Sequence, residues 1–250
     1  MEPLVRVAAD GGVATITMDS PRNRNALSLR LVGSLREALT AVLGDDGVRV
    51  VVLTGAGPAF CAGADLKEQA AGGAPPDVPG LVSLIWNSPK PVVARLNGPA
   101  RAGGLGLVTA CDLAVAPDTA TFAFTEVRLG VVPAMIAVTC LRRMNPRAAA
   151  EYFLTGESFG ASRAQEIGLI NRAVPAGELD AAVAHYTGML LRGAPEALAL
   201  AKRLPRTVPD LSVEEGFAAM TELSTERFSS AEAKEGIAAF LEKRDPRWLP

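Results

Sequence analysis

The chain has 250 residues, of which 49% are apolar, and its 25 Lys and Arg against 27 Asp and Glu leave a net charge of −2. This length and apolar share suit one sizeable domain, or a domain with an appendage. The near-neutral charge argues against a nucleic-acid partner. No apolar run approaches the roughly 20 residues that a membrane helix needs, so we expect no membrane partner.

The cysteine and histidine content bears on metals and compartment. Three scattered cysteines, Cys61, Cys111 and Cys140, form no CxxC pair, and His185 is the single histidine. A zinc-type metal site is therefore not expected. The first residues show no basic segment followed by an apolar core, which is the pattern of a secretory signal. We expect reduced thiols and a cytoplasmic protein.

The first predicted elements are a β-hairpin and a capped helix. Two alternating runs in VRVAADGGVATITMD flank Asp10-Gly11-Gly12, which is a hairpin signal. Ser28 is a suitable N-cap for the helix that follows, and Gly44 is expected to end it. Apolar residues recur in this helix at helical spacing, at Leu31, Leu35, Leu39 and Val42.

Two buried strands, a loop and a helical region follow. The apolar runs VRVVVLTG and PVVARLNG each predict a buried strand, and EQAAGGAPPDVPG between them predicts a mobile loop. DLAVAPDTATFAFTEV predicts two short strands with a turn at Pro117-Asp118. From Pro146 onward, helical patterns succeed one another. We predict an α/β core over residues 1–190 and a helical part over residues 191–250.

Each predicted buried strand is followed by a loop rich in small residues, AFCAGADL and GPARAGGLGL. Parallel neighbouring strands would bring both loops to one edge of the sheet, where ligand sites form in α/β proteins. Gly103 and Gly104 would open a short helix running toward Cys111, whose free N–H groups suit a developing negative charge. Opposed N–H groups around one oxygen would form an oxyanion hole. Two tight turns with packing glycines remain the alternative.

Six segments, in order along nearly the whole chain, carry a resemblance to a known family. They are NRNALS, LTGAGPAFCAGADLKE, NGPARAGGLGLVTACDLAVA, FAFTEVRLGVVP, FLTGESFGASRAQEIGLINRAVP and AFLEKRDPRW. Together they resemble the crotonase family (enoyl-CoA hydratase/isomerase), in its single-glutamate form. The resemblance implies an α/β crotonase-like spiral of β-β-α repeats with a helical C-terminal trimerisation region. It also implies an acyl-CoA thioester as substrate, no separate cofactor, a homotrimer or homohexamer, and a role in fatty acid metabolism.

The same resemblance implies the catalytic positions. The two oxyanion N–H groups fall on Ala64 and Gly103, and the catalytic carboxylate on Glu126. Gly106 stands where two-glutamate relatives have their second carboxylate, and we interpret its missing side chain as volume left to substrate or water. Glu126 follows the apolar run TFAF, and an apolar pocket would raise its pKa toward that of a general acid/base. Pairing with Arg128 is the alternative.

Substrate-binding positions are also implied by the resemblance. Arg24 would contact a CoA phosphate, unless it is a solvated loop arginine, and main-chain groups of Ala62 and Leu66 would meet adenine. Asp65 is expected to cap the following helix. Lys243 would reach the CoA of a neighbouring subunit, unless it is a plain surface lysine. The full implied set is Arg24, Ala26, Ala62, Asp65, Leu66, Gly106, Pro133, Met135 and Lys243.

The reaction favoured by this pattern is hydration of a 2-enoyl-CoA thioester through an enolate held in the oxyanion hole. The combination of Gly106 with the later segment TEVRLGVVPA resembles one-glutamate hydratases of branched glutaconyl-type thioesters. With such a substrate, Arg101 would pair with a distal carboxylate. Two alternatives stay open: a delta-isomerase using Glu126 as its single proton shuttle, and a non-catalytic CoA-binding homologue. Asp112 is interpreted as structural.

Overall fold

The computed structural model describes residues 3–72 and 74–249. It begins with the predicted hairpin, in which β1 (Val5–Asp10) pairs antiparallel with β2 (Val13–Met18). Gly11 and Gly12 form the turn with φ of 52° and 79°, the left-handed region that a two-residue hairpin turn requires.

The hairpin starts a six-stranded sheet in the order β1-β2-β3-β4-β6-β9, and every neighbouring pair after β1–β2 is parallel. The two strands predicted around Pro117-Asp118 both form, but they enter different sheets. Strand β6 joins the large sheet and β7 joins a small one. The remaining strands are β3 (Val50–Gly55), β4 (Val92–Arg95), β5 (Ala100–Arg101), β6 (Leu113–Pro117), β7 (Thr121–Ala123), β8 (Phe159–Gly160) and β9 (Arg172–Val174).

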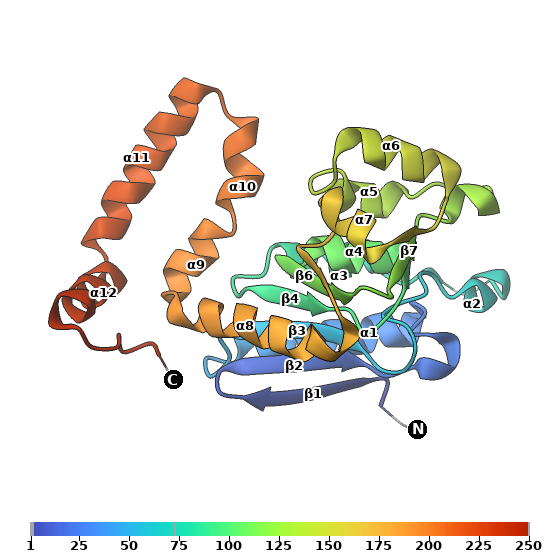
Figure 1. The fold of residues 1–250 in the computed structure, drawn as a ribbon, viewed down its shortest axis with the longest axis horizontal. Helices are drawn as coiled ribbons and strands as arrows, with labels where there is room; N and C mark the ends of the chain where they lie inside the picture. The colour runs from blue at the N-terminus through green and yellow to red at the C-terminus, as the bar shows by residue number, and fades with distance from the viewer. Residues whose placement is uncertain (1–2, 73, 250) are drawn as a thin grey trace.

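Helices cover both faces of the large sheet (Figure 1). Ser28 caps α1 (Leu29–Gly44), accepting a hydrogen bond from the Leu31 amide at 3.2 Å, as predicted. Alternate residues of β3 divide between two cores: Val51 and Leu53 join the main core, whereas Val50 and Val52 pack with α8 (Leu179–Arg192). The other helices of the body are α2 (Leu66–Ala70), α3 (Val78–Trp86), α4 (Gly103–Ala110), α5 (Ala134–Cys140), α6 (Pro146–Thr155) and α7 (Ala161–Glu166).

Two sequence expectations are revised here. The segment 68–80, predicted as a mobile loop, is helical at both ends, where it contributes to α2 and α3; residue 73 within it lies outside the described residues. The boundary expected after residue 190 falls inside α8, which continues to Arg192. Within the described residues, no helix combines the length and apolarity needed to cross a bilayer.

The helices after α8 form an arm that projects from the body (Figure 1). Its longest helix begins with a capping box, in which Ser212 and Glu215 satisfy each other's backbone N–H groups. Large apolar side chains stand exposed on the arm, among them Phe217 (73%), Phe228 (72%) and Phe240 (82%). The arm comprises α9 (Pro195–Ala201), α10 (Leu204–Thr207), α11 (Val213–Ser229) and α12 (Ala231–Glu242).

The arm is anchored to the body by a buried ion cluster. Asp112 immediately precedes β6. Its Oδ2 lies 2.8 Å from Lys202 Nζ and its Oδ1 lies 2.6 Å from Arg206 Nη2. Its Oδ2 also accepts a hydrogen bond from the Val92 amide of β4 at 2.8 Å. The Arg206 guanidinium also stacks on the Trp86 ring, 3.8 Å from its centroid. This arrangement agrees with the structural role expected for Asp112.

We predict that the exposed arm is covered by further copies of the chain. Light scattering should give a trimer or hexamer, because aromatic side chains as exposed as Phe240 are costly to leave in water. A chain ending after Arg206, which lacks α11 and α12, should be aggregated or unfolded at the same concentration. A stable, active monomer would contradict the prediction.

Candidate active site

The two glycine-containing loops meet at one edge of the large sheet, as predicted. Strands β3 and β4 pair in parallel with Val51 opposite Val92, so their carboxyl ends lie side by side. The loops that follow are joined by an isolated bridge between Cys61 and Ala100, and the Arg101 amide donates to the Cys61 carbonyl at 2.9 Å.

Two glycines permit this close approach. Gly63 has φ of +88°, and a Cβ there would lie 2.9 Å from Ala102 Cβ and 3.0 Å from the Arg101 carbonyl oxygen. A Cβ on Gly104 would lie 2.7 Å from the Cys61 carbonyl oxygen. Real Cβ atoms essentially never approach other atoms to less than 3.0 Å. The glycines therefore bring the two main chains together and set the N-terminus of α4 against the first loop.

The Ala64 and Gly103 amides lie beside each other in this junction. A Cβ on Gly103 would be 3.9 Å from the Ala64 nitrogen, and one on Gly63 would be 3.4 Å from the Gly103 nitrogen. Gly103 opens α4, so its N–H has no acceptor within the helix; the Ala64 N–H has no backbone acceptor within residues 3–72 and 74–249. Ala102, with φ of 46°, holds a strained conformation of the kind found at functional sites.

Both amides border a cavity of about 330 Å³. Its wall is mainly apolar, and Gln69, Thr125 and Glu126 carry its polar side chains among the described residues. No Lys or Arg of the described chain lines it. The wall consists of Leu27, Ala62, Ala64, Leu66, Gln69, Pro75, Pro76, Val78, Ala102, Gly103, Thr125, Glu126, Leu129, Val131, Val132, Pro133, Ala134, Met135 and Ile136.

Glu126 begins a 3₁₀ turn, Glu126–Leu129, at the cavity wall. Its Oε2 is buried and has no hydrogen-bond partner. Arg128 does not pair with it: the Arg128 Nε donates instead to the Thr155 carbonyl at 3.1 Å, so the alternative ion pair is wrong. Burial raises the pKa of the Glu126 carboxyl, which increases its basicity and suits it to take up and return a proton.

Four of the implied binding residues, Ala62, Leu66, Pro133 and Met135, line the cavity. Ala62 offers only its carbonyl oxygen, because its N–H donates to the Arg24 carbonyl at 3.0 Å. The contact of Ala62 and Leu66 main-chain groups with adenine stays a prediction, in which Ala62 would take part through its carbonyl oxygen.

The other implied binding residues lie outside the cavity wall. Asp65 caps α2 as predicted, accepting from the Lys67 and Glu68 amides at 3.2 and 3.3 Å. Arg24 is exposed and Ala26 is buried beneath the same loop. Lys243 ends α12 on the projecting arm (Figure 1), and its contact with the ligand of a neighbouring subunit stays a prediction.

Gly106 does not leave open volume. A Cβ there would lie 2.5 Å from Ile136 Cγ2 and 3.6 Å from Val82 Cγ2. The space that we assigned to substrate or water is filled by Ile136, and Gly106 is not part of the cavity wall. The glycine instead lets α4 pack closely on α5.

Arg101 also differs from expectation. Its guanidinium donates from Nη2 to the Thr121 hydroxyl at 2.7 Å, and from Nη1 to the Thr121 carbonyl. It does not line the cavity, so it is not positioned to meet a carboxylate of the acyl group there.

Several residues of the cavity wall were not foreseen from the sequence, among them Leu27, Leu129, Val131 and Val132. Leu27 lies within NRNALS, and its Cδ1 is 3.0 Å from where a Cβ on Gly103 would stand. For Val131 and Val132 the sequence held a signal, because they are apolar residues in an otherwise turn-like stretch. In the structure they are 55% and 70% exposed.

We predict that Gly103→Val lowers kcat/KM by about 10²–10³-fold, the typical cost of losing one oxyanion donor. The new side chain would stand between Leu27 and the Ala64 nitrogen and keep a carbonyl oxygen from both amides. Gly33→Val in α1 is the matched control, because a Cβ there meets nothing within 4 Å. Both variants should show native circular dichroism, and equal activity of the two would contradict the prediction.

In this fold, two backbone amides and one buried carboxylate thus share a single, mainly apolar cavity. The enoyl-CoA hydratase/isomerase family model matches residues 8–249, and the chain belongs to this family. The chain is 38% identical over 247 residues to a Thermus thermophilus protein provisionally named an enoyl-CoA hydratase, covering 95% of this chain and 98% of the other.

Two further relatives support the same assignment. The carnitinyl-CoA dehydratase of Salmonella arizonae is 36% identical over 260 residues, covering 99% of each chain. The crystal structure of an enoyl-CoA hydratase from Mycobacterium smegmatis superposes with a TM-score of 0.91 at 35% identity, covering 100% of both chains. The crotonase-like fold expected from the sequence is confirmed.

Proposed function

We propose that this enzyme adds water across the double bond of a 2-enoyl-CoA thioester. The observation that carries the proposal is the buried, unpartnered Oε2 of Glu126 at the same cavity as the Ala64 and Gly103 amides. A proton carrier and two oxyanion donors are the groups that such a reaction requires.

In the proposed mechanism, the thioester carbonyl oxygen accepts hydrogen bonds from the Ala64 and Gly103 amides. The Glu126 carboxylate takes a proton from water as the water oxygen bonds to C3. The electron pair of the double bond moves to the carbonyl oxygen, which becomes an enolate oxygen held by both amides. The enolate then collapses, and protonated Glu126 returns its proton to C2.

The cavity chemistry supports an uncharged acyl segment next to the thioester. No cation lines the cavity within the described residues, and Arg101 is hydrogen bonded to Thr121. A short acyl group ending in a carboxylate, of the glutaconyl type, would place its charge against apolar side chains such as Val131 and Ile136, which is unfavourable.

Hydration is favoured over isomerisation by the relatives named carnitinyl-CoA dehydratase, because loss of water from a CoA thioester is the reverse of adding water to one. The test is a panel of 2-enoyl-, 3-enoyl- and 3-methylglutaconyl-CoA thioesters with products identified by mass. We expect a product heavier by one water from a short 2-enoyl thioester. Conversion of 3-enoyl to 2-enoyl thioester without water gain would identify an isomerase, and binding without turnover a non-catalytic homologue.

A further inference from the structure

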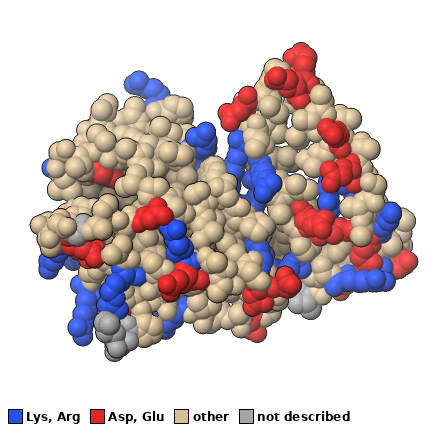
Figure 2. Space-filling model, turned by 180° about the vertical axis from the view of Figure 1, so that it is seen from behind, with Lys and Arg blue, Asp and Glu red and all other residues tan. Residues whose placement is uncertain are grey.

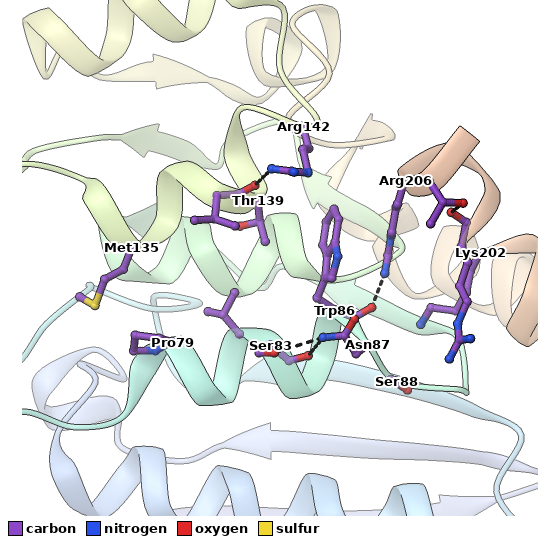
Figure 3. A pocket seen from close by; sticks show the side chains of 14 residues that line it. Pro79, Ser83, Trp86, Asn87, Ser88, Met135, Thr139, Arg142, Lys202 and Arg206 are labelled. Atoms are coloured by element: carbon purple, nitrogen blue, oxygen red, sulfur yellow. Dashed lines mark hydrogen bonds between the residues drawn. The ribbon is translucent and has the colours of Figure 1, made fainter. Parts of the chain in front are cut away.

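A second hollow, of about 630 Å³, lies between α3, α5 and the beginning of the arm (Figure 3). We call it the α3–α5 groove. Neither the reaction centre nor the anchoring of the arm accounts for an opening of this size. Its wall consists of Pro79, Val82, Ser83, Trp86, Asn87, Ser88, Met135, Val138, Thr139, Arg142, Lys202, Arg203, Arg206 and Thr207.

The groove adjoins the catalytic cavity. Met135 lines both. On α3, Val78 lines the cavity and the next residue, Pro79, lines the groove. Met135 is 56% exposed, and an unbranched thioether side chain adopts alternative rotamers easily. The two hollows are therefore neighbours, and the side chain of Met135 lies where they meet.

Positive charge accumulates in the groove. Met135 lies at one end of Figure 3, and Arg206 and Lys202 lie at the other. Arg142, Lys202, Arg203 and Arg206 line the groove, and no Asp or Glu of the described chain does. Figure 2 shows Lys and Arg side chains along the notch between the body and the arm.

Asp112 neutralises only part of this charge. It pairs with Lys202 and Arg206 from behind the groove, whereas Arg142 and Arg203 form no ion pair within the described residues. The Arg206 side chain is only 9% exposed, and its Nε is buried without a hydrogen-bond partner. Arg142 donates from Nη1 to the Val138 carbonyl at 3.2 Å. Arg142 and Arg203 are both exposed, so they present uncompensated positive charge to the groove.

We propose that the α3–α5 groove is a distal acyl subsite that binds a carboxylate at the far end of the substrate's acyl chain. With the thioester at Ala64 and Gly103, the chain would leave the cavity past Met135. Its methylenes would run along Pro79, Val82 and Val138, and the terminal carboxylate would meet Arg142 and Arg203. The proposal depends on the proposed function only in placing the thioester between the two amides.

This subsite differs from the short glutaconyl-type substrate considered above. There the carboxylate would lie inside the apolar cavity, whereas here a longer chain carries it beyond Met135. Charge-assisted hydrogen bonds to Arg are among the stronger polar contacts. The preference for a carboxylated acyl chain should therefore appear only when the chain is long enough for its carboxylate to reach the arginines.

The test compares equilibrium binding of saturated acyl-CoA thioesters in pairs of equal length, one methyl-terminated and one ω-carboxylated, by titration calorimetry. The wild type should bind the longer carboxylated member about ten-fold more tightly than its methyl partner and show no such preference in the shortest pair. The double variant Arg142→Gln/Arg203→Gln should lose the preference. Arg147→Gln, an exposed arginine of α6 outside the groove, should retain it.

Equal binding within every pair, or tighter binding of the methyl-terminated member throughout, would overturn the proposal. Retention of the preference by the double variant would overturn it as well. Because the readout is binding, the result is separable from hydration: absence of turnover with an intact carboxylate preference defeats the proposed function and leaves the subsite standing.

Discussion

Glu126→Gln should lower the rate of water addition by at least about 10²-fold, the usual contribution of a positioned general acid/base, while thioester binding persists. The amide keeps the shape of the side chain and removes its ability to carry a proton. Turnover is measured on a short 2-enoyl-CoA, and binding by titration with a saturated acyl-CoA. Near-native turnover of the variant would refute the assigned mechanism.

The same substitution should stabilise the fold at neutral pH. Burial raises the pKa of Glu126 in the folded state above the pKa of about 4.3 that it has in the unfolded chain. At pH values between these two pKa values, the folded chain keeps the proton on Glu126 and the unfolded chain has released it. Stability therefore falls as pH rises through this window. Glu126→Gln removes this pH-dependent loss of stability. The Tm of the variant should therefore exceed that of the wild type by a small amount at acidic pH and by a larger amount at pH 7.

Asp112→Asn should destabilise the protein by about 3–5 kcal/mol, the range for breaking a buried ion cluster from one side. The change leaves Lys202 and Arg206, whose side chains are 7% and 9% exposed, without their shared carboxylate. Because both residues belong to the arm, the arm should detach from the body first. Urea unfolding at fixed protein concentration measures the difference.

The control is an exposed ion pair of similar geometry. Asp180 accepts Arg95 Nε at 2.6 Å but is 81% exposed, so Asp180→Asn should change the free energy of unfolding by less than about 1 kcal/mol. Equal effects of the two substitutions would show that the Asp112 cluster is not the anchor that its burial indicates.

Local signals in the sequence were sufficient for most elements. The paired glycines at residues 11 and 12, the Ser28 cap and the apolar spacing of α1 depend on neighbours within a few residues, and each formed as predicted. The convergence of the two glycine-containing loops was also predictable, because adjacent parallel strands end at one edge. Family resemblance added Ala64, Gly103 and Glu126 to that edge.

Only the tertiary structure decided what surrounds those three residues. Ile136 fills the space beside Gly106, and the Arg101 guanidinium donates a hydrogen bond to Thr121. In both cases the partner lies at least 20 positions away along the chain. The cationic groove depends likewise on α10 folding back against α3 and α5. Helical and strand periodicity report which face of an element is buried, but not which distant side chain meets it. The sequence alone therefore determined the elements and the sheet edge at which the two loops meet, whereas packing determined the shape and charge of the two hollows.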